Sequence, residues 1–348
     1  MVIPATRHTV AILQVRQLLQ GAVARGHDGD ALLERAGIAP ALLRSPLSRV
    51  TQSQYAALIR VLSRRLRDEL WGLGGRPLHL GTFAQACRLM VGCRTLGEAL
   101  RTGFHYYHLQ LADFVPRLVV DSGQAQLRLI SRGPREPMSG YADRTFCFFS
   151  YGLASWLVAR RIPVGGVMYR PMDLGCSSDA ERLFQAPVRY HHPWVGFCFD
   201  AHWLDQPVVQ TAQTLQAFLQ DAPGSLLIRY RDEGSLAERI RRHLRRHLDG
   251  DMPTLEAVGR AMALGPQTLR RRLREEGQGF QSIKDDLRRD AAIEFLAQAG
   301  LTLPDIAGRL GFSEASTFHR AFKSWTGLAP GVYREQQLRL RGRPGSEA

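Results

Sequence analysis

The sequence predicts a mixed α/β N-terminal domain followed by an all-α C-terminal domain, and three observations support this fold class. Strand-like alternation of apolar residues is confined to about the first 205 of the 348 residues. From Leu226 on, apolar residues recur at helical spacing alone. This second part also contains an internal repeat of paired helices. A chain of this length can form two domains, each with its own hydrophobic core.

The N-terminal part is expected to begin with helices. Residues 10–25 and 53–70 carry apolar residues at helical spacing, with a short helical turn over 32–46 between them. Residues 95–110 predict a helix whose first turn is a capping box of Thr95 and Glu98. Residues 117–132 predict a β-hairpin, because alternating apolar residues flank the turn sequence Asp-Ser-Gly.

The remainder of this part alternates between helix and strand. Residues 141–161 predict a long and mostly buried helix, and residues 162–171 and 194–200 are strand candidates. Residues 205–225 contain a further helix and the exit from the domain. We therefore expect one domain over residues 10–220 and a linker over residues 221–235.

Two copies of one pattern follow, over residues 254–273 and 302–322. Each copy is a helix, a tight turn with glycine and a second helix, which is the helix-turn-helix pattern, and the second turn is one residue longer. The corresponding apolar positions are Leu255, Val258, Met262 and Leu264 in the first copy and Leu303, Ile306, Leu310 and Phe312 in the second.

The last helix of the repeat has one apolar and one basic face. At about 100° per residue, Phe322 and Trp325 fall within roughly 60° of Phe318. The polar side chains of Ser316, Arg320 and Lys323 fall on the opposite side. Ser313 suits the N-cap and Gly327 suits the C-terminal stop. A solvated surface helix explains this pattern equally well for one copy, but two matched copies favour insertion into a DNA major groove.

Residues 280–300 join the two copies and carry apolar residues at helical spacing. About 18 helical residues span roughly 27 Å, so the rod can hold two recognition helices near one DNA turn, about 34 Å, apart. One chain would then contact two successive major-groove segments. The alternative is a helical bundle that binds a protein partner.

The net charge of +14 favours an anionic partner. The charge is not concentrated in the repeat, since the chain from Arg229 on has 22 basic and 16 acidic residues. A non-specific polyanion or membrane-surface binder is therefore a further alternative, and it predicts steep salt dependence without sequence preference.

Motifs for catalysis, metal binding and secretion are absent from the sequence. The five cysteines are scattered without a C-x-x-C pair and indicate free thiols in a reducing cytoplasm. No secretory signal or membrane-spanning run is present. His243 and His247 have helical i,i+4 spacing, but four neighbouring arginines oppose a divalent metal. We expect no cofactor, no metal and no enzymatic activity.

The C-terminal repeat contains the stretches LRRRLREEGQGFQSIKDDLRRDAA and DIAGRLGFSEASTFHRAFKSWTGLAPGVYR. They resemble the first recognition helix with its rod and the C-terminal signature of the DNA-binding domain of AraC/XylS-type transcriptional regulators. One departure is Gly265 followed by Pro266, where the family usually has a serine N-cap. The resemblance implies a double helix-turn-helix domain over residues 236–338. The candidate DNA contacts are Gln267, Thr268, Arg270, Arg271, Arg274, Ala315, Ser316, His319, Arg320 and Lys323.

The N-terminal part resembles the effector-binding domain of the arabinose-binding-like branch of these regulators. SRVTQSQYAAL, TLGEALRTGFHYYHL and LFQAPVRYHHPWVGFCFD carry this resemblance, while the usual GDPxLGL stretch appears only as DELWGLGGRPLHLGTF. The resemblance implies a domain that senses a small molecule, which need not be arabinose, and that often helps to dimerise.

Aromatic and polar residues on elements expected to be buried are the candidates for effector contact. A pocket is mostly apolar with a few placed polar groups, and an arginine there can pair with a carboxylate ligand. The alternative for each is a place in the core or, for the arginine, in a surface ion pair. The candidates are Tyr106, Tyr107, His108, Arg144, Phe148, His191 and Trp194.

The sequence as a whole predicts a regulator that binds double-stranded DNA and responds to an unknown small-molecule effector. We expect an activator that works with RNA polymerase, forms a homodimer and acts in the bacterial cytoplasm on nucleoid DNA. The alternative in another functional class is an enzyme domain fused to a DNA-binding module. The tail, residues 339–348, is expected to be disordered.

Overall fold

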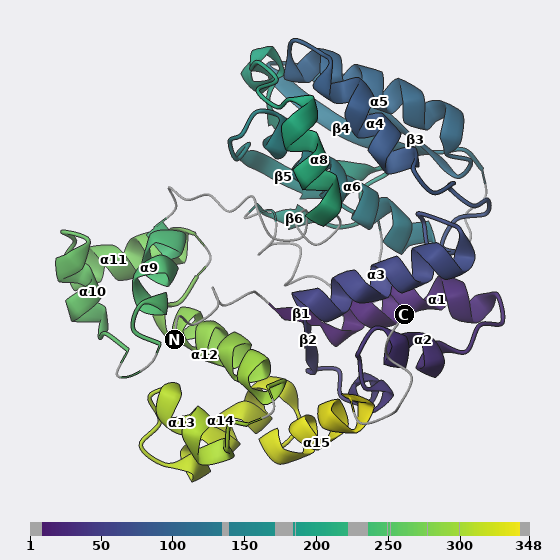
Figure 1. Cartoon of the computed structure of the whole chain (residues 1–348). Helices are drawn as coiled ribbons and strands as arrows, with labels where there is room; N and C mark the ends of the chain where they lie inside the picture. The colour runs from purple at the N-terminus through teal and green to yellow at the C-terminus, as the bar shows by residue number, and fades with distance from the viewer. Residues whose placement is uncertain are drawn as a thin grey trace. The chain divides into compact units, whose positions relative to one another are not determined.

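The computed structural model describes residues 9–133, 139–170, 184, 186–221, 236–248, 250, 252–276, 278–298 and 300–341. The chain divides into two compact units (Figure 1). The sheet unit comprises Leu13–Leu32 and Ala56–Tyr230, and the helical unit comprises Met1–Ile12, Leu33–Tyr55 and Arg231–Ala348.

The sheet unit is built around a five-stranded mixed sheet with strand order β3-β4-β7-β5-β6. All neighbouring strands are antiparallel except β5 and β6, which are parallel. The predicted hairpin is confirmed: β3 pairs with β4, and Asp121 is opposite Gln124 across the turn. The bounds are β3 Phe114–Asp121, β4 Gln124–Ser131, β5 Val164–Met168, β6 Val188–Arg189 and β7 Val195–Asp200.

Helices and one long loop accompany this sheet. The predicted long helix is confirmed as α6, whose Tyr151 is fully buried and donates a hydrogen bond to the carbonyl of Ile162 over 3.1 Å. Thr95 accepts from the backbone N–H of Glu98 at the start of α5, as expected. The carboxylate of Glu98, however, accepts from the backbone N–H of Arg94 rather than of Thr95. The bounds are α4 Thr82–Val91, α5 Leu96–Gln110, α6 Ser139–Leu157, η2 Ala201–Asp205 and α8 Ala212–Asp221.

The chain passes between the two units within helices near its N-terminus. These helices are α1 Ile12–Ala24, α2 Gly29–Arg35 and α3 Gln52–Leu66. The short helical turn predicted between α1 and α3 is observed as α2 and a 3-10 helix, η1 Pro40–Arg44. The sequence pattern did not predict α4, β6 or the short strands β1 Thr9–Ala11 and β2 Arg49–Thr51.

The helical unit contains the two predicted helix-turn-helix motifs, joined by one long helix. The first motif is α10 Leu255–Ala261 and α11 Pro266–Glu275, preceded by α9 Leu236–Arg245. The connecting helix is α12 Phe280–Leu296, whose 17 residues agree with the predicted length of about 18. The second motif is α13 Leu303–Arg309 and α14 Ala315–Thr326, followed by α15 Pro330–Arg341.

The two motifs begin in the same way. The hydroxyl of Thr254 accepts from the N–H of Ala257 at the start of α10, and Thr302 accepts from Asp305 at the start of α13. The second turn is longer by one residue, as predicted, because three residues separate the caps Leu310 and Glu314. The N-cap of α14 is Glu314, so the expectation of Ser313 there is wrong; Glu314 has the extended backbone and makes no side-chain cap.

A left-handed residue follows the first helix in both turns, and here the copies differ chemically. Gly311 has φ +72°, whereas Ala263 has φ +54° in the equivalent place. A left-handed backbone costs a non-glycine residue about 1–2 kcal/mol. Ala263→Gly should therefore raise the free energy of unfolding by about 0.5–1 kcal/mol, after allowing for the entropy of glycine.

The matched variant for this prediction is Gly311→Ala. It should lower the free energy of unfolding, because a Cβ there adopts the unfavourable backbone and collides with the carbonyl of Gly250. Urea denaturation of both variants measures the pair. A gain in the free energy of unfolding for Ala263→Gly and a loss for Gly311→Ala support this role of the left-handed turn residue. A loss of stability in Ala263→Gly contradicts it.

An N-terminal segment packs against the second motif within the helical unit. The two strands β1 and β2 pair antiparallel, with Val10 opposite Val50. The buried hydroxyl of Tyr333 on α15 donates to the carbonyl of Arg49 over 2.8 Å. Ser45 donates to the carbonyl of Thr326 at the end of α14 over 2.9 Å. The helical unit is therefore not formed by the C-terminal residues alone.

The compact units divide the N-terminal part differently from the expected domains. Residues 10–12 and 33–55 belong to the helical unit, although the sequence suggested one N-terminal domain over residues 10–220. The proposed linker, residues 221–235, lies outside the described residues except for Asp221 at the end of α8. The expected disordered tail overlaps the last turn of α15 at residues 339–341, and residues 342–348 lie outside the described part.

Candidate DNA interface and effector cavity

The outer faces of α11 and α14 carry the candidate DNA contacts. All ten side chains are described, and all are exposed except Thr268, which is half-buried. Arg270, Arg271 and Arg274 project from α11, and His319, Arg320 and Lys323 project from α14. The structure therefore groups these residues on two accessible basic helix faces.

Apolar residues on the opposite face hold each of these helices in place. Leu269 and Leu273 anchor α11, with exposures of 0% and 1%. Phe318 and Phe322 anchor α14, and their ring centroids lie 5.8 Å apart. This is the division into a buried apolar face and an exposed basic face that the sequence predicted. It determines which side chains of each helix are accessible to DNA.

The start of α9 is bound to the end of α11. Both carboxylate oxygens of Glu276 accept backbone N–H groups, from Leu236 and Ala237, over 2.9 Å each. A helix N-terminus has free N–H groups and partial positive charge, so a carboxylate satisfies both. Gln278 adds a hydrogen bond from Arg241 over 2.8 Å. The first recognition helix is thus fixed within a three-helix motif.

Two of the candidate contacts already have partners on their own helix. Arg271 forms an exposed i,i+4 ion pair with Glu275, with 3.0 Å between nitrogen and oxygen. Ser316 donates a hydrogen bond to Glu314 over 2.9 Å. Exposed pairs of this kind contribute little free energy, so both side chains remain available to exchange these partners for DNA.

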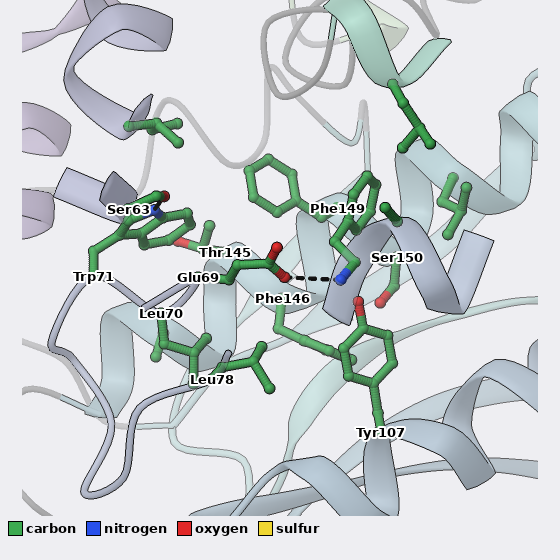
Figure 2. Close-up of a pocket in the computed structure, with 16 residues that line it drawn as sticks. Ser63, Glu69, Leu70, Trp71, Leu78, Tyr107, Thr145, Phe146, Phe149 and Ser150 are labelled. Atoms are coloured by element: carbon green, nitrogen blue, oxygen red, sulfur yellow. Dashed lines mark hydrogen bonds between the residues drawn. The ribbon is translucent and has the colours of Figure 1, made fainter. Parts of the chain in front are cut away.

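A cavity of about 270 Å³ lies inside the sheet unit (Figure 2). Its lining comes from helices and one loop, with no strand residue among the described lining. This cavity loop, residues 67–81, joins α3 to α4. The lining residues are Ile59, Ser63, Glu69, Leu70, Trp71, Leu78, Phe83, Ala84, Tyr107, Ala142, Thr145, Phe146, Phe149, Ser150, Leu153 and Leu219.

The cavity loop is held by a buried carboxylate. Asp68 is 1% exposed and accepts three backbone N–H groups, from Leu70, Gly72 and Leu78. These bonds fold the loop back on itself, and the backbone N–H of Glu69 donates to the carbonyl of Leu78 over 2.7 Å. Glu69 is thereby turned toward the cavity.

Glu69 meets the start of α4. One carboxylate oxygen accepts from the backbone N–H of Gly81 over 2.7 Å, and the other accepts from the backbone N–H of Phe83 over 2.8 Å. The second of these bonds is the dashed line in Figure 2. Burial raises the pKa of the Glu69 carboxyl above its ordinary value, while these two hydrogen bonds act in the opposite direction. The charge of the nearby Asp68 raises the pKa further.

Aromatic side chains form much of the cavity wall. Trp71 has φ +54°, which is rare for a bulky residue, and its indole N–H donates to Ser63 over 2.9 Å. Its ring meets Phe149 edge-on with 6.1 Å between centroids. Tyr107 packs edge-on against Phe146 over 4.9 Å, and Figure 2 shows its hydroxyl turned toward the middle of the cavity. The rings of Trp71 and Tyr107 and the carboxylate of Glu69 thus line the same space.

Of the seven candidate effector contacts, Tyr107 is the one that lines this cavity. Phe148 is a core residue, packed against Phe149 and Phe184. Arg144 lies over the rings of Tyr141 and Tyr169, at 5.7 and 6.0 Å.

The other four candidates also lie outside the cavity lining. Tyr106 is half-buried, and His108 and His191 are exposed. Trp194 is half-buried, with the guanidinium of Arg128 4.9 Å from its ring centroid. Their role in effector binding stays a prediction.

Residue type alone did not reveal Glu69 and Trp71 as cavity residues. The available signal was the stretch DELWGLGG, in which two acids and a tryptophan stand beside glycines and the family-like pattern is broken. A stretch that departs from the family's usual sequence is a place where one member can have its own ligand-binding residues. Its side chains come together only when α3, α4 and α6 are packed.

Among the described residues, no group of three His, Cys, Asp or Glu side chains could hold a metal ion. Over the same part of the chain, no helix is both long and apolar enough to span a membrane. Two helix-turn-helix motifs with exposed basic helices, together with a separate unit enclosing a cavity, define a DNA-binding protein with a ligand-binding domain.

Comparisons with known proteins identify the family. Residues 26–208 match the model described as the arabinose-binding domain of AraC transcription regulators, N-terminal, and residues 258–336 match a helix-turn-helix domain model. The chain belongs to the AraC family of DNA-binding transcription regulators, with an N-terminal ligand-binding domain. This confirms the family and the fold class that the sequence predicted.

Several relatives are similar along nearly the whole chain. The ornithine utilization regulator of Pseudomonas aeruginosa is 26% identical over 331 residues, covering 95% of this chain and 97% of that protein. An uncharacterized HTH-type transcriptional regulator of Mycobacterium tuberculosis is 28% identical and covers 94% of this chain and 96% of its own. The crystal structure of the regulator CdpR from Pseudomonas aeruginosa is 21% identical in sequence and covers 72% of this chain and 81% of its own, with a TM-score of 0.29.

Proposed function

We propose that this protein is a ligand-responsive transcription activator in which α11 and α14 contact two successive major-groove segments of one DNA site. The observation that carries the proposal is the pair of exposed basic faces, each on the second helix of a repeated motif. An α-helix fits the major groove, where arginine and lysine reach guanine and phosphate. The 17 residues of α12 span about 25 Å between the motifs, which suits neighbouring groove segments.

The effector is proposed to bind in the cavity of the sheet unit. An apolar, partly enclosed space with a few polar groups is typical of small-molecule sites. The similarity to an ornithine utilization regulator supports sensing of a nitrogen-containing metabolite as one candidate class. We further propose a homodimer that engages RNA polymerase, acting on nucleoid DNA in the bacterial cytoplasm. Catalysis by the N-terminal part is the weaker alternative, since the relatives above are named as regulators.

Selection of genomic fragments with the full-length protein at physiological salt, followed by footprinting, tests this function. We expect one enriched sequence with two protected segments about one helical turn apart for each protomer. Uniform binding that weakens steeply with salt and enriches no sequence would contradict it. Transcription from the selected promoter with purified RNA polymerase then distinguishes activation from repression.

Replacing Arg271 on α11 with alanine should weaken binding to the selected site by about 1–3 kcal/mol, or roughly 5- to 150-fold, if its guanidinium contacts a base. Titration in a gel shift at fixed salt measures the change. Arg94→Ala is the matched control, because it removes one exposed arginine paired with Glu98 in the sheet unit. Equal affinities for the two variants would exclude a base contact by Arg271.

A further inference from the structure

The cavity is lined by one ionisable carboxylate and by no described lysine, arginine or histidine. Its remaining polar side chains are neutral, from serine, threonine and tyrosine. Burial raises the pKa of the Tyr107 hydroxyl well above its ordinary value, so this group is a neutral donor and acceptor near pH 7. Among the described lining residues, the one formal charge that a ligand meets is therefore the negative charge of Glu69.

The carboxylate of Glu69 has unused hydrogen-bonding capacity. An ionised carboxylate offers about four lone-pair sites, and the N–H groups of Gly81 and Phe83 use one on each oxygen. No ion pair to Glu69 is found among the described residues. The two N–H groups at the start of α4 offset part of the cost of burying this charge, and a bound cation would offset more of it.

The walls around Glu69 suit the body of an organic cation. The ring face or edge of Trp71, Phe149 and Tyr107 borders the same space (Figure 2). Aromatic faces attract an ammonium group through their quadrupole and also bury an apolar chain or ring. The cavity volume of about 270 Å³ lies at the lower end of the range for small-molecule pockets, so the ligand is small.

We propose that this cavity binds a small monocationic amine with an apolar or aromatic body, whose ammonium group contacts the carboxylate of Glu69. The proposal rests on the function above, in which this cavity receives the effector. It excludes effectors that enter as free carboxylates or phosphates, because the described lining offers them no cation. Glu69 thereby selects the class of ligand by charge, and the aromatic walls select it by shape.

Titration calorimetry of the full-length protein with matched probes tests the proposal. Benzylamine, 2-phenylethylamine and 3-phenylpropylamine supply the cation at three lengths, and 2-phenylethanol and phenylacetate supply a neutral and an anionic counterpart. We expect one of the amines to bind at least tenfold more tightly than 2-phenylethanol, with phenylacetate weakest. Failure of all three amines at millimolar concentration, or equal binding of the alcohol or the acid, overturns the assignment.

The variant Glu69→Gln should remove the preference for the amine over the alcohol. Because glutamine cannot accept both N–H groups, the variant is expected to be less stable, so the informative quantity is the ratio of the two affinities. Asp121→Asn is the control, since Asp121 is an exposed carboxylate at the hairpin turn and should keep the ratio of the unmodified protein. A ratio unchanged in Glu69→Gln overturns the contact.

The affinity for the amine should also fall as the pH is lowered from 7 to 5. Because the pKa of Glu69 lies above its ordinary value, its carboxylate takes up a proton at a higher pH than an exposed glutamate does, whereas the amine itself stays charged. The other titratable groups around Glu69 are Asp68 on the same loop, Cys87 on α4 and Tyr107 on α5. Burial raises the pKa of Cys87 and Tyr107, so both stay protonated. Binding of 2-phenylethanol should not change over this range; an amine affinity that is equally flat overturns the role of the ionised carboxylate.

A gel shift with the selected DNA site, on the same protein preparations, separates this inference from the proposed function. Specific DNA binding without amine binding means that only the class of effector is wrong. If the unmodified protein binds no DNA sequence specifically, the proposed function itself is wrong.

Discussion

Replacing Phe322 with alanine should lower the free energy of unfolding of the helical unit by about 3–5 kcal/mol. The side chain is fully buried at the centre of the second motif, and its ring lies 5.8 Å from Phe318 and 5.5 Å from Tyr333. Removing it deletes the ring contact between Phe322 on α14 and Tyr333 on α15, and a close-packed interior fills such a void only in part. Hydrogen exchange of the α12–α15 peptides, followed by mass spectrometry, measures the loss of local stability.

The control for Phe322 is Arg320→Ala, two residues away on the same helix but on the exposed face. Its effect on hydrogen exchange should correspond to less than about 0.5 kcal/mol, while its affinity for the selected DNA site should fall by about 1–3 kcal/mol. Phe322→Ala should reduce both properties. If Arg320→Ala destabilised the unit as much as Phe322→Ala, the division of α14 into a packing face and a DNA-binding face would be wrong.

The helix-turn-helix units were predictable because their information is local. Alternation of Phe318 and Phe322 with Arg320 is read directly from helical periodicity, and the family-like signature extends over the same residues. The N-cap of α14 was less predictable, because Ser313 and Glu314 are both polar and only the backbone conformation distinguishes them.

Long-range features could not be predicted in the same way. The strands β1 and β2 are three residues each, too short for a periodic signal, and they pair across about 40 residues of intervening chain. The effector candidates were chosen for aromatic or polar character, but Phe148 packs in the core and Tyr107 lines the cavity. Residue type is the same in both environments, so only the packing of α3, α4, α5 and α6 distinguishes a wall from a core.

Replacing Asp290 with alanine should lower the free energy of unfolding of the helical unit by about 3 kcal/mol. The carboxylate is 4% exposed and lies on α12, the helix that joins the two DNA-binding motifs. It accepts from the hydroxyl of Thr9 over 2.6 Å and from the guanidinium of Arg289 over 3.1 Å. Thr9 in turn accepts from Arg49 over 2.7 Å, so one network connects β1, β2 and α12. Hydrogen bonds to charged groups contribute about 1.5–3 kcal/mol each, and their buried partners would be left short of acceptors.

Removing one partner of a buried ion pair costs about 3–5 kcal/mol of stability. The loss for Asp290→Ala should stay near the lower end of this range, because Asp286 remains 2.9 Å from Arg289 and keeps that cation paired. Asp285→Ala is the matched control, because Asp285 lies on the same helix. Among the described contacts, its carboxylate accepts only an exposed hydrogen bond from Gln281 over 2.9 Å. This variant should change the free energy of unfolding by less than about 0.5 kcal/mol. Hydrogen exchange should increase in the β1–β2 peptides as well as in α12 for Asp290→Ala. An increase confined to α12 would mean that Thr9 and Arg49 do not tie the N-terminal segment to the rod; an increase in both would mean that the position of the rod between the recognition helices depends on residues from the start of the chain.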